Sequence, residues 1–453
     1  MMWNRITLLT SLAVCALGAE PPGGFDGLKL GLFTHYTYAY PGYKYGWTHL
    51  APGLCRPVPD LNTLADSFDA TAFAETAASM KAEYVIFTLF HAQMNVLYPS
   101  AYWERVLPGH TSLRDVIADL IAALRARNIR LVLYFHPVDG LDFTPQQQDR
   151  TGWTKYRTGF DVKPWNDLIN GLMEETGARY GKAIAGYWLD GAPSPPKFDG
   201  VRFKATIRRH NPDAAVWVNY GLPTERFPNN RRMFAGLSDY AVSENFLGKI
   251  AGTVDTDLWP VDHNMVAVEI SSEWWATCGR LQQTPEKMMR YTVRLAGTAE
   301  QRHGGVAWAA GPFANNEWET GVRDGLRQLG NLLAPIGESV FGTVPSTAYA
   351  THAGTLQKDT WGVATDSRDG RSVYLHVLNP PADGRSLRIP KAADGRRFRS
   401  ARVLAPGRRA TLRGDASGYR ITLPKGELWS ATDTVIRLEV VHGPGSAAIS
   451  RAR

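Results

Sequence analysis

The chain has 453 residues, of which 44% are hydrophobic and 11% aromatic, and its 50 Lys and Arg residues outnumber 43 Asp and Glu residues to give a net charge of +7. This composition excludes a disordered chain, and the length suffices for one large barrel and a second domain. The sequence holds no phosphate-binding loop, nucleic-acid-binding motif or metal-spaced Cys/His cluster, so no nucleic-acid partner is expected. The charge predicts a solvated basic surface, with attraction to acidic polysaccharide as the alternative.

Residues 1–19 have the pattern of a secretory signal peptide. Arg5 lies in a short polar start, an apolar run follows from Ile6 to Leu17, and Gly18-Ala19 offers small residues for cleavage. The apolar run is too short to span a bilayer. We therefore expect a secreted or periplasmic protein, and export without a lipid anchor is favoured because Val14 is bulky for a lipoprotein signal.

Short β-rich runs alternate with helical patterns from residue 28 onward, which is typical of parallel βα units. Eight such runs predict a (β/α)8 barrel over residues 25–345. The expected strands are Leu30–His35, Tyr84–His91, Arg130–His136, Ile184–Asp190, Ala215–Tyr220, Tyr240–Glu244, Met265–Ser271 and Gly305–Ala310.

The clearest helix is expected from Leu113 to Arg127, where apolar residues recur at helical spacing and cover the outside of the barrel. Ser112 and Asp115 form a start that resembles a capping box. A second amphipathic helix is expected over residues 325–333. The long Tyr-, Pro- and Gly-rich loop over residues 36–62 is expected to form a wall of the site.

The pattern changes after residue 345 to short alternating segments separated by Asp-Gly, Pro-Gly and Ser-Gly turns. This predicts a small antiparallel β-sandwich over residues 346–442, followed by a flexible tail over residues 443–453. Trp361 and Trp429 are isolated in this region, so it offers no aromatic platform for a sugar. We expect the sandwich to support the barrel rather than to bind sugar.

Asp190 ends the apolar run Ala183–Leu189 and is followed at once by Gly191. An acid at the C-terminal end of a barrel strand lies where such barrels carry their active sites. The alternative is an aspartate that caps the following helix at a βα turn.

Three histidines, His35, His91 and His136, end the first three predicted strands and should converge on the same rim. Neutral imidazoles can hydrogen-bond sugar hydroxyls because each ring offers one donor and one acceptor. A zinc site is the alternative, but no two of these histidines have metal-ligand spacing within one element. We therefore expect no metal and no other cofactor.

Further acids follow the later strands, namely Glu244 and either Glu269 or Glu273. Two carboxyl groups facing one substrate are the requirement for glycoside hydrolysis. Aromatic residues that could pack on the apolar side of a sugar ring are Tyr36, Trp47, Tyr98, Trp188, Trp274 and Trp275.

Several motifs together resemble the retaining α-L-fucosidase family of glycoside hydrolases. The opening Gly31-Leu32-Phe33-Thr34-His35 is similar to G-I-F-I-H, and Tyr187-Trp188-Leu189-Asp190-Gly191 is similar to the W-F-D-G motif that holds the nucleophile. The other segments that carry the resemblance are Phe68-Asp69 with Tyr84–Thr88, Asp239–Glu244, Trp275–Cys278, and Gly330–Leu333 with Gly342-Thr343.

The chain departs from the family pattern at two positions. Ala92 stands where the family's K-H-H-D-G-F motif has its second histidine, and it is followed by Gln93. Ala276 replaces the glutamate of W-E-T-C. Both lost groups belong to the family's sugar-binding or catalytic residues, so the fold is a firmer expectation than the substrate.

The resemblance implies a barrel followed by a β-sandwich and an exo-glycosidase that acts on terminal α-L-fucosyl or related residues of oligosaccharides or glycoconjugates. Asp190 would be the nucleophile and Glu244 the acid/base, with Glu273 as the alternative. The expected sugar contacts are His35, His91, Tyr134, His136, Trp188 and Trp275. A carbohydrate-binding relative that has lost catalysis, or a glycosidase for another sugar, is the rival hypothesis. The sequence leaves the oligomeric state open.

Overall fold

The computed structural model describes most of the chain between residues 25 and 441. The described residues are 25, 27–38, 58–91, 93–138, 140, 143–191, 196–219, 237–245, 264–269, 281, 283–299, 305–352, 361–381, 384 and 386–441, without the side chains of 240–245 and 264–269. The predicted signal peptide and tail lie outside these ranges. Within them, no helix combines the length and the hydrophobicity that crossing a bilayer requires.

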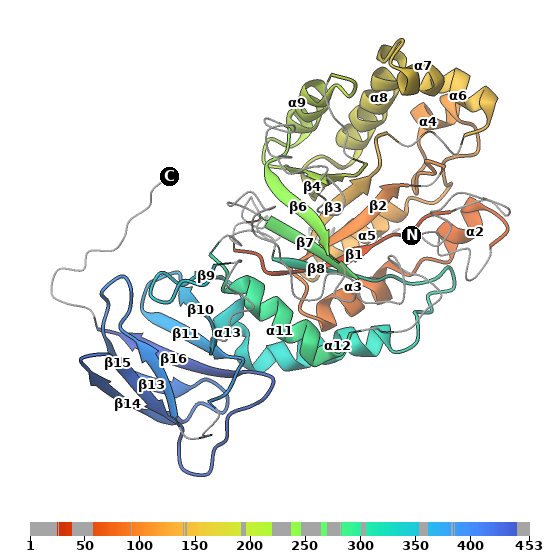
Figure 1. The fold of residues 1–453 in the computed structure, drawn as a ribbon. Coiled ribbons are helices and arrows are strands. Elements are labelled where there is room, and N and C mark those ends of the chain that lie inside the picture. Colours follow the sequence, from red (N-terminus) through yellow and green to blue (C-terminus); the bar gives the residue numbers. More distant parts are fainter. Residues whose placement is uncertain are drawn as a thin grey trace, which may run out of the picture.

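Eight parallel strands form a closed barrel in chain order, as the sequence predicts (Figure 1). All eight overlap the expected runs, with ends that differ by at most two residues. The strands are β1 (Leu30–Thr34), β2 (Tyr84–Phe90), β3 (Arg130–Phe135), β4 (Ile184–Leu189), β5 (Ala215–Asn219), β6 (Tyr240–Asn245), β7 (Asn264–Glu269) and β8 (Val306–Ala309).

In the barrel strands whose side chains are described, alternate residues face different cores, which explains why these strands read as continuous apolar runs. In β2, Tyr84 and Ile86 belong to the cluster inside the barrel, whereas Val85 and Phe87 pack against the surrounding helices.

At the N-terminal end of the barrel, burial lowers the pKa of Lys29 to about 8, although the carboxylate of Glu83 opposes this shift.

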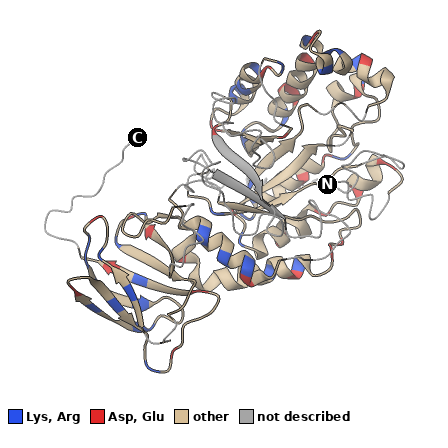
Figure 2. Cartoon of the chain, viewed as in Figure 1, with Lys and Arg blue, Asp and Glu red and all other residues tan. Residues whose placement is uncertain are grey.

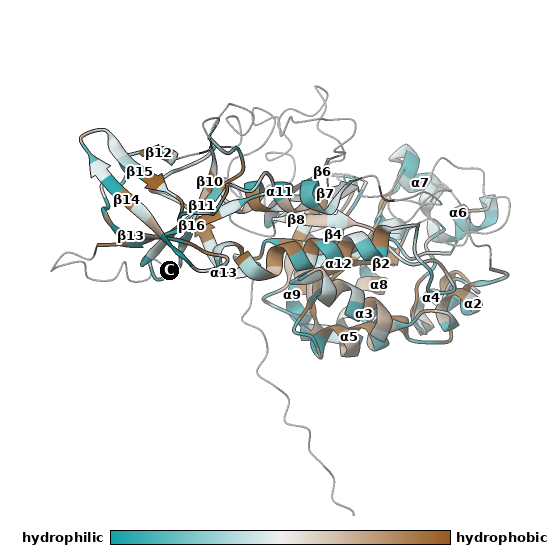
Figure 3. Cartoon of the chain, turned by 90° about the horizontal axis from the view of Figure 1, so that it is seen from below, coloured by the Kyte–Doolittle hydropathy of each residue, from teal (hydrophilic) through white to brown (hydrophobic). Residues whose placement is uncertain are grey.

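Helices on the outside of the barrel complete this domain. They are α2 (Leu61–Asp66), α3 (Ala70–Ser79), α4 (Ala101–Val106), α5 (Val116–Arg125), α6 (Pro145–Thr151), α7 (Trp153–Thr158), α8 (Lys163–Tyr180), α9 (Gly200–His210), α11 (Pro285–Ala296) and α12 (Val322–Leu333). Figure 3 shows hydrophobic and hydrophilic bands alternating along α12, whose residues Leu326, Leu329 and Leu333 are buried.

The predicted start of the helix at residue 113 is wrong. The side chain of Asp115 caps α5 by accepting a hydrogen bond from the Ala118 amide, so the helix begins at Val116. The hydroxyl of Ser112 donates instead to the carbonyl of Arg114 at 2.7 Å. Leu113 precedes the cap and is 81% exposed rather than part of the core. The aspartate side chain therefore competes successfully with the apolar pattern in setting this helix end.

The C-terminal part forms one continuous antiparallel sheet in the order β12-β15-β14-β13-β16-β11-β10-β9. Its strands are β9 (Thr343–Pro345), β10 (Gly362–Ser367), β11 (Ser372–Val377), β12 (Ser386–Pro390), β13 (Phe398–Val403), β14 (Arg409–Asp415), β15 (Gly418–Thr422) and β16 (Thr434–Val440). Residues of both halves of this sheet share one apolar core, against which Trp361 and Trp429 pack. The predicted sandwich is thus built from a single sheet whose edges are β9 and β12.

The short helix α13 (Gly337–Val340) connects the barrel to this sheet. The imidazole of His376, on β11, contacts the Asp433 carboxylate at 2.7 Å and the Ser339 carbonyl of α13 at 3.2 Å. The side chains of His376 and Asp433 are fully buried. Tyr374 and Val435 of the sheet belong to the same apolar cluster as the barrel helices. The two parts therefore share a packed interface.

Candidate active site

Asp190 directly follows β4 at the C-terminal mouth of the barrel, and three donors hold its carboxylate. Oδ1 accepts hydrogen bonds from the Gly191 amide at 2.7 Å and from the Asn219 side-chain amide at 2.9 Å. Oδ2 accepts one from the hydroxyl of Tyr134. Tyr134 and Asn219 are fully buried, whereas Asp190 is partly exposed. The carboxylate is thus fixed from behind and accessible from the mouth.

These donors come from the strands on either side of β4. Tyr134 lies on β3 and Asn219 ends β5, and both strands pair with β4 in the closed barrel. The alternative that Asp190 caps the next helix is wrong, because Asp199 caps α9. The closed barrel therefore brings the donors on β3 and β5 to the Asp190 carboxylate, and this carboxylate does not cap α9.

The histidines that follow the first two strands converge beside Asp190, and their rings form a three-membered cluster with Tyr134. The ring centroid of Tyr134 lies 4.3 Å from that of His35 and 5.5 Å from that of His91. The rings of His35 and His91 are 5.1 Å apart. The expected convergence of the strand ends is therefore present for these residues.

The hydrogen bonds around Thr88 fix the tautomer of His35. The hydroxyl of Thr88 donates to the Thr34 carbonyl at 3.1 Å, so its oxygen accepts from Nδ1 of His35, also at 3.1 Å. A neutral ring that donates through Nδ1 presents Nε2 as an acceptor. In its neutral form, His35 can therefore accept a hydrogen bond through Nε2.

His136 lies on the other side of the same cluster, with its ring 5.5 Å from that of His91. It packs directly against Gly191, where an added Cβ would lie 2.2 Å from the Cε1 of His136. Gly191 also has a φ of +74°, which disfavours residues with a side chain. The turn after Asp190 therefore requires glycine for two independent reasons.

The segment after His91 departs from the family pattern and is held by a buried histidine. His110 donates from Nδ1 to the Gln93 carbonyl at 2.8 Å, and its Nε2 lies 2.9 Å from the Gln147 amide nitrogen. Burial lowers the pKa of His110, which favours the neutral ring that this arrangement of one donor and one acceptor requires. Gln93 has a φ of +58°, so this contact holds a strained backbone next to the site.

Three aromatic residues proposed to contact a sugar lie in the protein core instead. Trp188 is fully buried inside the barrel, with its ring 5.0 Å from that of Phe33. The hydroxyl of Tyr36 donates to the Leu64 carbonyl at 2.9 Å, and that of Tyr98 contacts Thr176 on α8, also at 2.9 Å. We therefore assign all three to structural packing.

Several predicted residues have no described side chain. Glu244 occupies the penultimate position of β6, with its backbone beside Ala267 of β7, and Glu269 ends β7. Both positions are at the C-terminal end of the barrel. The other predicted residues lie outside the described ranges and comprise Trp47, Ala92, Glu273, Trp274, Trp275 and Ala276.

Asn219 and Thr88, which hold Asp190 and His35, were not predicted from the sequence. Both lie at or near the C-terminal ends of predicted strands, which is the same signal that the histidines carry. Neither residue is charged, and their partners become evident only when the barrel closes.

In the described part of the chain, no three His, Cys, Asp or Glu side chains are arranged to hold a metal ion.

Comparisons with known proteins find similarity to α-L-fucosidases. Residues 58–245 match the family model described as Alpha-L-fucosidase. This part of the chain, about two fifths of its length, is similar to the α-L-fucosidase family. A protein of Oryza sativa subsp. japonica, provisionally named alpha-L-fucosidase 1, is 27% identical over 182 residues, which cover 39% of this chain and 31% of the rice protein. The sequence match thus spans about a third of that relative.

Solved structures of α-L-fucosidases share the fold over nearly the whole chain. The alpha-L-fucosidase isoenzyme 1 of Paenibacillus thiaminolyticus aligns with a TM-score of 0.65 and 20% identity, covering 91% of this chain and 97% of that one. An α-L-fucosidase of Bacteroides thetaiotaomicron aligns with a TM-score of 0.65 and 18% identity, covering 94% and 97%. The predicted family resemblance and the predicted architecture are both confirmed.

A substitution at Asn219 can test whether this residue orients the Asp190 carboxylate. Replacing Asn219 by alanine removes one of the two donors to Oδ1 of Asp190, so the carboxylate should lose its fixed orientation. We expect kcat to fall about 10- to 100-fold, corresponding to roughly 1.4–2.8 kcal/mol of transition-state stabilisation. Kinetics on an aryl glycoside would measure this effect.

The control is Asn211→Ala, because Asn211 donates to the Ile184 carbonyl at 2.9 Å near the opposite end of β4. This control should lower stability but leave kcat within about two-fold. Equal losses of kcat in both variants would assign Asn219 a purely structural role.

Proposed function

We propose that the protein is an exo-glycosidase that releases terminal α-L-fucosyl or closely related residues with retention of configuration. The proposal rests on the position of the Asp190 carboxylate. Hydrogen bonds from Tyr134, Asn219 and Gly191 hold it at the mouth of the barrel. His35 and His91 lie in the same mouth, and the family match includes β2 to β6. The predicted signal peptide supports action outside the cytoplasm.

In the first step, Oδ2 of Asp190 attacks the anomeric carbon while the bond to the leaving oxygen breaks. Oδ2 has one donor and Oδ1 has two, so Oδ2 is the oxygen that can form the new bond with less rearrangement. Glu244 gives its proton to the leaving oxygen. As Oδ2 gives an electron pair to the new bond, it loses its negative charge and accepts the hydrogen bond from Tyr134 more weakly, while the leaving oxygen takes the electron pair of the broken bond.

In the second step, Glu244 takes a proton from water, and the resulting hydroxide attacks the anomeric carbon. The bond between the sugar and Asp190 then breaks and restores the carboxylate. Such a double displacement requires the two carboxyl groups to lie only about 5–5.5 Å apart.

His35 and His91 would hydrogen-bond ring hydroxyls, and the absence of a second histidine at Ala92 would change the preferred sugar. An unpaired buried polar group costs about 1–3 kcal/mol, which is enough to shift preference ten-fold or more. The preferred glycoside is therefore proposed as a fucoside or a close structural relative of one.

A panel of 4-nitrophenyl glycosides tests the proposal directly. We expect turnover of the α-L-fucoside or of a related α-glycoside, and NMR of the first-formed sugar should show the anomeric configuration of the substrate. Inversion would exclude the double displacement. Binding of the sugars without any turnover would favour the rival hypothesis of a carbohydrate-binding relative that has lost catalysis.

The identity of the acid/base can be decided by chemical rescue. Glu244→Ala should retain the first step on an activated aryl glycoside, because that leaving group needs no proton. The second step should be slow, and added azide should restore turnover by forming a glycosyl azide of unchanged configuration. Rescue of Glu273→Ala, in the absence of rescue for Glu244→Ala, would move the assignment to Glu273.

A further inference from the structure

The net positive charge of the protein is concentrated in the C-terminal sheet. Residues 386–441 contain twelve Lys and Arg residues against five Asp and Glu residues, an excess of seven that equals the net charge of the whole chain. The remainder of the chain is therefore balanced in charge. Figure 2 shows basic residues gathered on these strands.

The register of the sheet aligns six of the arginines into two rows. Across β12, β15 and β14, Arg388 lies opposite Arg420, which lies opposite Arg413. Across β14, β13 and β16 the row consists of Arg409, Arg402 and Arg437.

The two rows lie on one continuous face, because Arg409, Thr411 and Arg413 are alternate, exposed residues of β14. Ala410 and Leu412, between them, turn toward the apolar core. We call these six residues the arginine face: Arg388, Arg402, Arg409, Arg413, Arg420 and Arg437.

Acidic partners are present only at the two ends of the arginine face. Arg388 pairs with Asp415 at 3.1 Å, and Arg437 lies 3.4 Å from Glu338 of α13. The four arginines between them form no ion pair with any described residue. Like charges directly opposite each other destabilise a sheet. The sheet thus maintains an unfavourable arrangement that an external anion would relieve.

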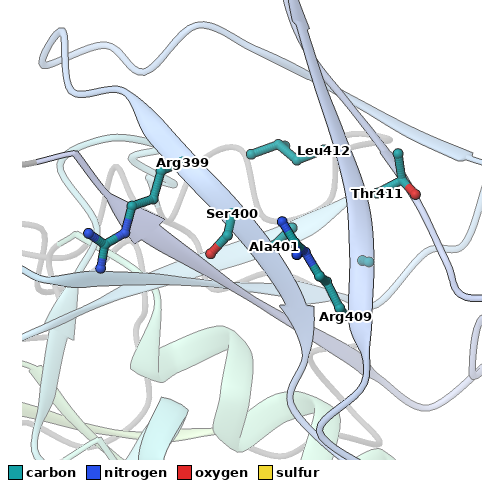
Figure 4. Close-up of a pocket in the computed structure, with 7 residues that line it drawn as sticks. Arg399, Ser400, Ala401, Arg409, Thr411 and Leu412 are labelled. Carbon is teal, nitrogen blue, oxygen red and sulfur yellow. The ribbon is translucent and has the colours of Figure 1, made fainter.

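A cavity of about 350 Å³ opens between β13 and β14, next to this face (Figure 4). Arg399 and Arg409 line it together with the hydroxyl-bearing residues Ser400 and Thr411. Glu439 neutralises Arg399 through a contact of 3.2 Å. Arg409 is therefore the cationic group of the cavity without an acidic partner among the described residues, and the cavity offers space for one acidic substituent.

We propose that the arginine face binds an acidic polysaccharide, with sulfate or carboxylate groups repeated along the chain. The planar guanidinium donates two parallel hydrogen bonds to such groups. Neighbouring strands place successive arginines about 4.8 Å apart, a spacing comparable to the length of one pyranose residue. The hydroxyls of Thr411 and Thr422, which lie opposite each other on the same face, suit the hydroxyls of a sugar chain.

This proposal departs from the expectation that the sheet only supports the barrel. That expectation rested on the lack of an aromatic platform for sugar. The alignment of arginines on neighbouring strands becomes visible only from the strand pairing in the structure. A saccharide is favoured over a membrane because the strands that carry the arginine face, β12 to β16, expose no large hydrophobic side chain. The exposed ones in the described C-terminal part are Val344 on the edge strand β9, Leu428 in the loop before β16 and Val441 after it. The binding does not require catalysis, so it is testable in a protein without activity.

Calorimetric titration with dextran sulfate, and with uncharged dextran of the same length, tests the proposal. We expect binding of dextran sulfate only, and binding that weakens at least several-fold between low and physiological salt, because salt screens exposed charges. The variant Arg402→Gln/Arg409→Gln/Arg413→Gln/Arg420→Gln should bind at least ten-fold more weakly.

The matched control removes four exposed barrel arginines that make no ion pair with described residues, in Arg105→Gln/Arg125→Gln/Arg157→Gln/Arg323→Gln. This control variant has the same net charge as the arginine-face variant, and it should bind dextran sulfate within two-fold of wild type. Equal weakening of both variants would mean that net charge alone attracts the polymer and would overturn the site. Tighter binding of duplex DNA or of phosphatidylserine vesicles than of dextran sulfate would overturn the choice of polysaccharide.

Discussion

Asp190→Asn is expected to lower kcat/KM at least about 10³-fold, because removal of a nucleophile leaves only binding and electrostatic stabilisation. The asparagine can fit without rearrangement. Its oxygen can accept from Gly191 and Asn219 as Oδ1 does, while its amide group donates to the oxygen of Tyr134. The loss should therefore be chemical and not structural. Kinetics on an activated aryl glycoside, beside thermal unfolding, would separate the two effects.

The matched control is Asp199→Asn, because Asp199 caps α9 and accepts from the Arg202 amide at 3.1 Å. Asparagine is as good a cap as aspartate, so activity and stability should both stay close to wild type. Retention of more than a tenth of the activity in Asp190→Asn would remove Asp190 from the nucleophile role, whatever its hydrogen bonds.

His376→Leu is expected to give a large loss of stability, about 3–5 kcal/mol, because it leaves the buried Asp433 carboxyl group without its partner. Both side chains of the pair are fully buried, and Oδ1 of Asp433 has no hydrogen-bond partner among the described residues. The substitution also removes the contact with the Ser339 carbonyl, which ties the sheet to α13. Urea unfolding followed by tryptophan fluorescence would measure the change.

Two further variants make this result specific. His376→Leu/Asp433→Leu removes both members of the pair and should recover a substantial part of the stability, because apolar residues can replace a buried polar pair. Asp415→Asn breaks the exposed pair with Arg388 and should cost no more than about 1 kcal/mol. A loss for His376→Leu as small as that for Asp415→Asn would show that the buried pair does not hold the interface.

The barrel strands with described side chains were predictable because they are buried on both faces and therefore read as apolar runs. The run that leads to Asp190 is an example, since Tyr187 and Leu189 pack under the helices while Trp188 fills the barrel. The start of α5 was not predictable from apolar spacing, since Leu113 fits the helical period but precedes the aspartate cap. Local hydrogen bonding decided that boundary.

The candidate site was predictable to the extent that strand ends share one rim. Asp190, His35 and His91 follow from that rule, together with the family motifs. Trp188 did not, because its position two residues before Asp190 turns it into the barrel one level below the mouth. Asn219 and Thr88 required the neighbouring strands to be in register, and that information is spread over distant parts of the chain.

The two edges of the C-terminal sheet have a consequence for the behaviour of the protein in solution. The edge strand β9 has only three residues and ends at Pro345, and the edge strand β12 ends at Pro390. Proline has no amide hydrogen to donate, and short or proline-bearing edges resist the addition of another strand. The closed barrel has no edges at all. A second chain thus finds little template for strand addition, so amyloid-like aggregation of the folded protein should be slow even at high concentration.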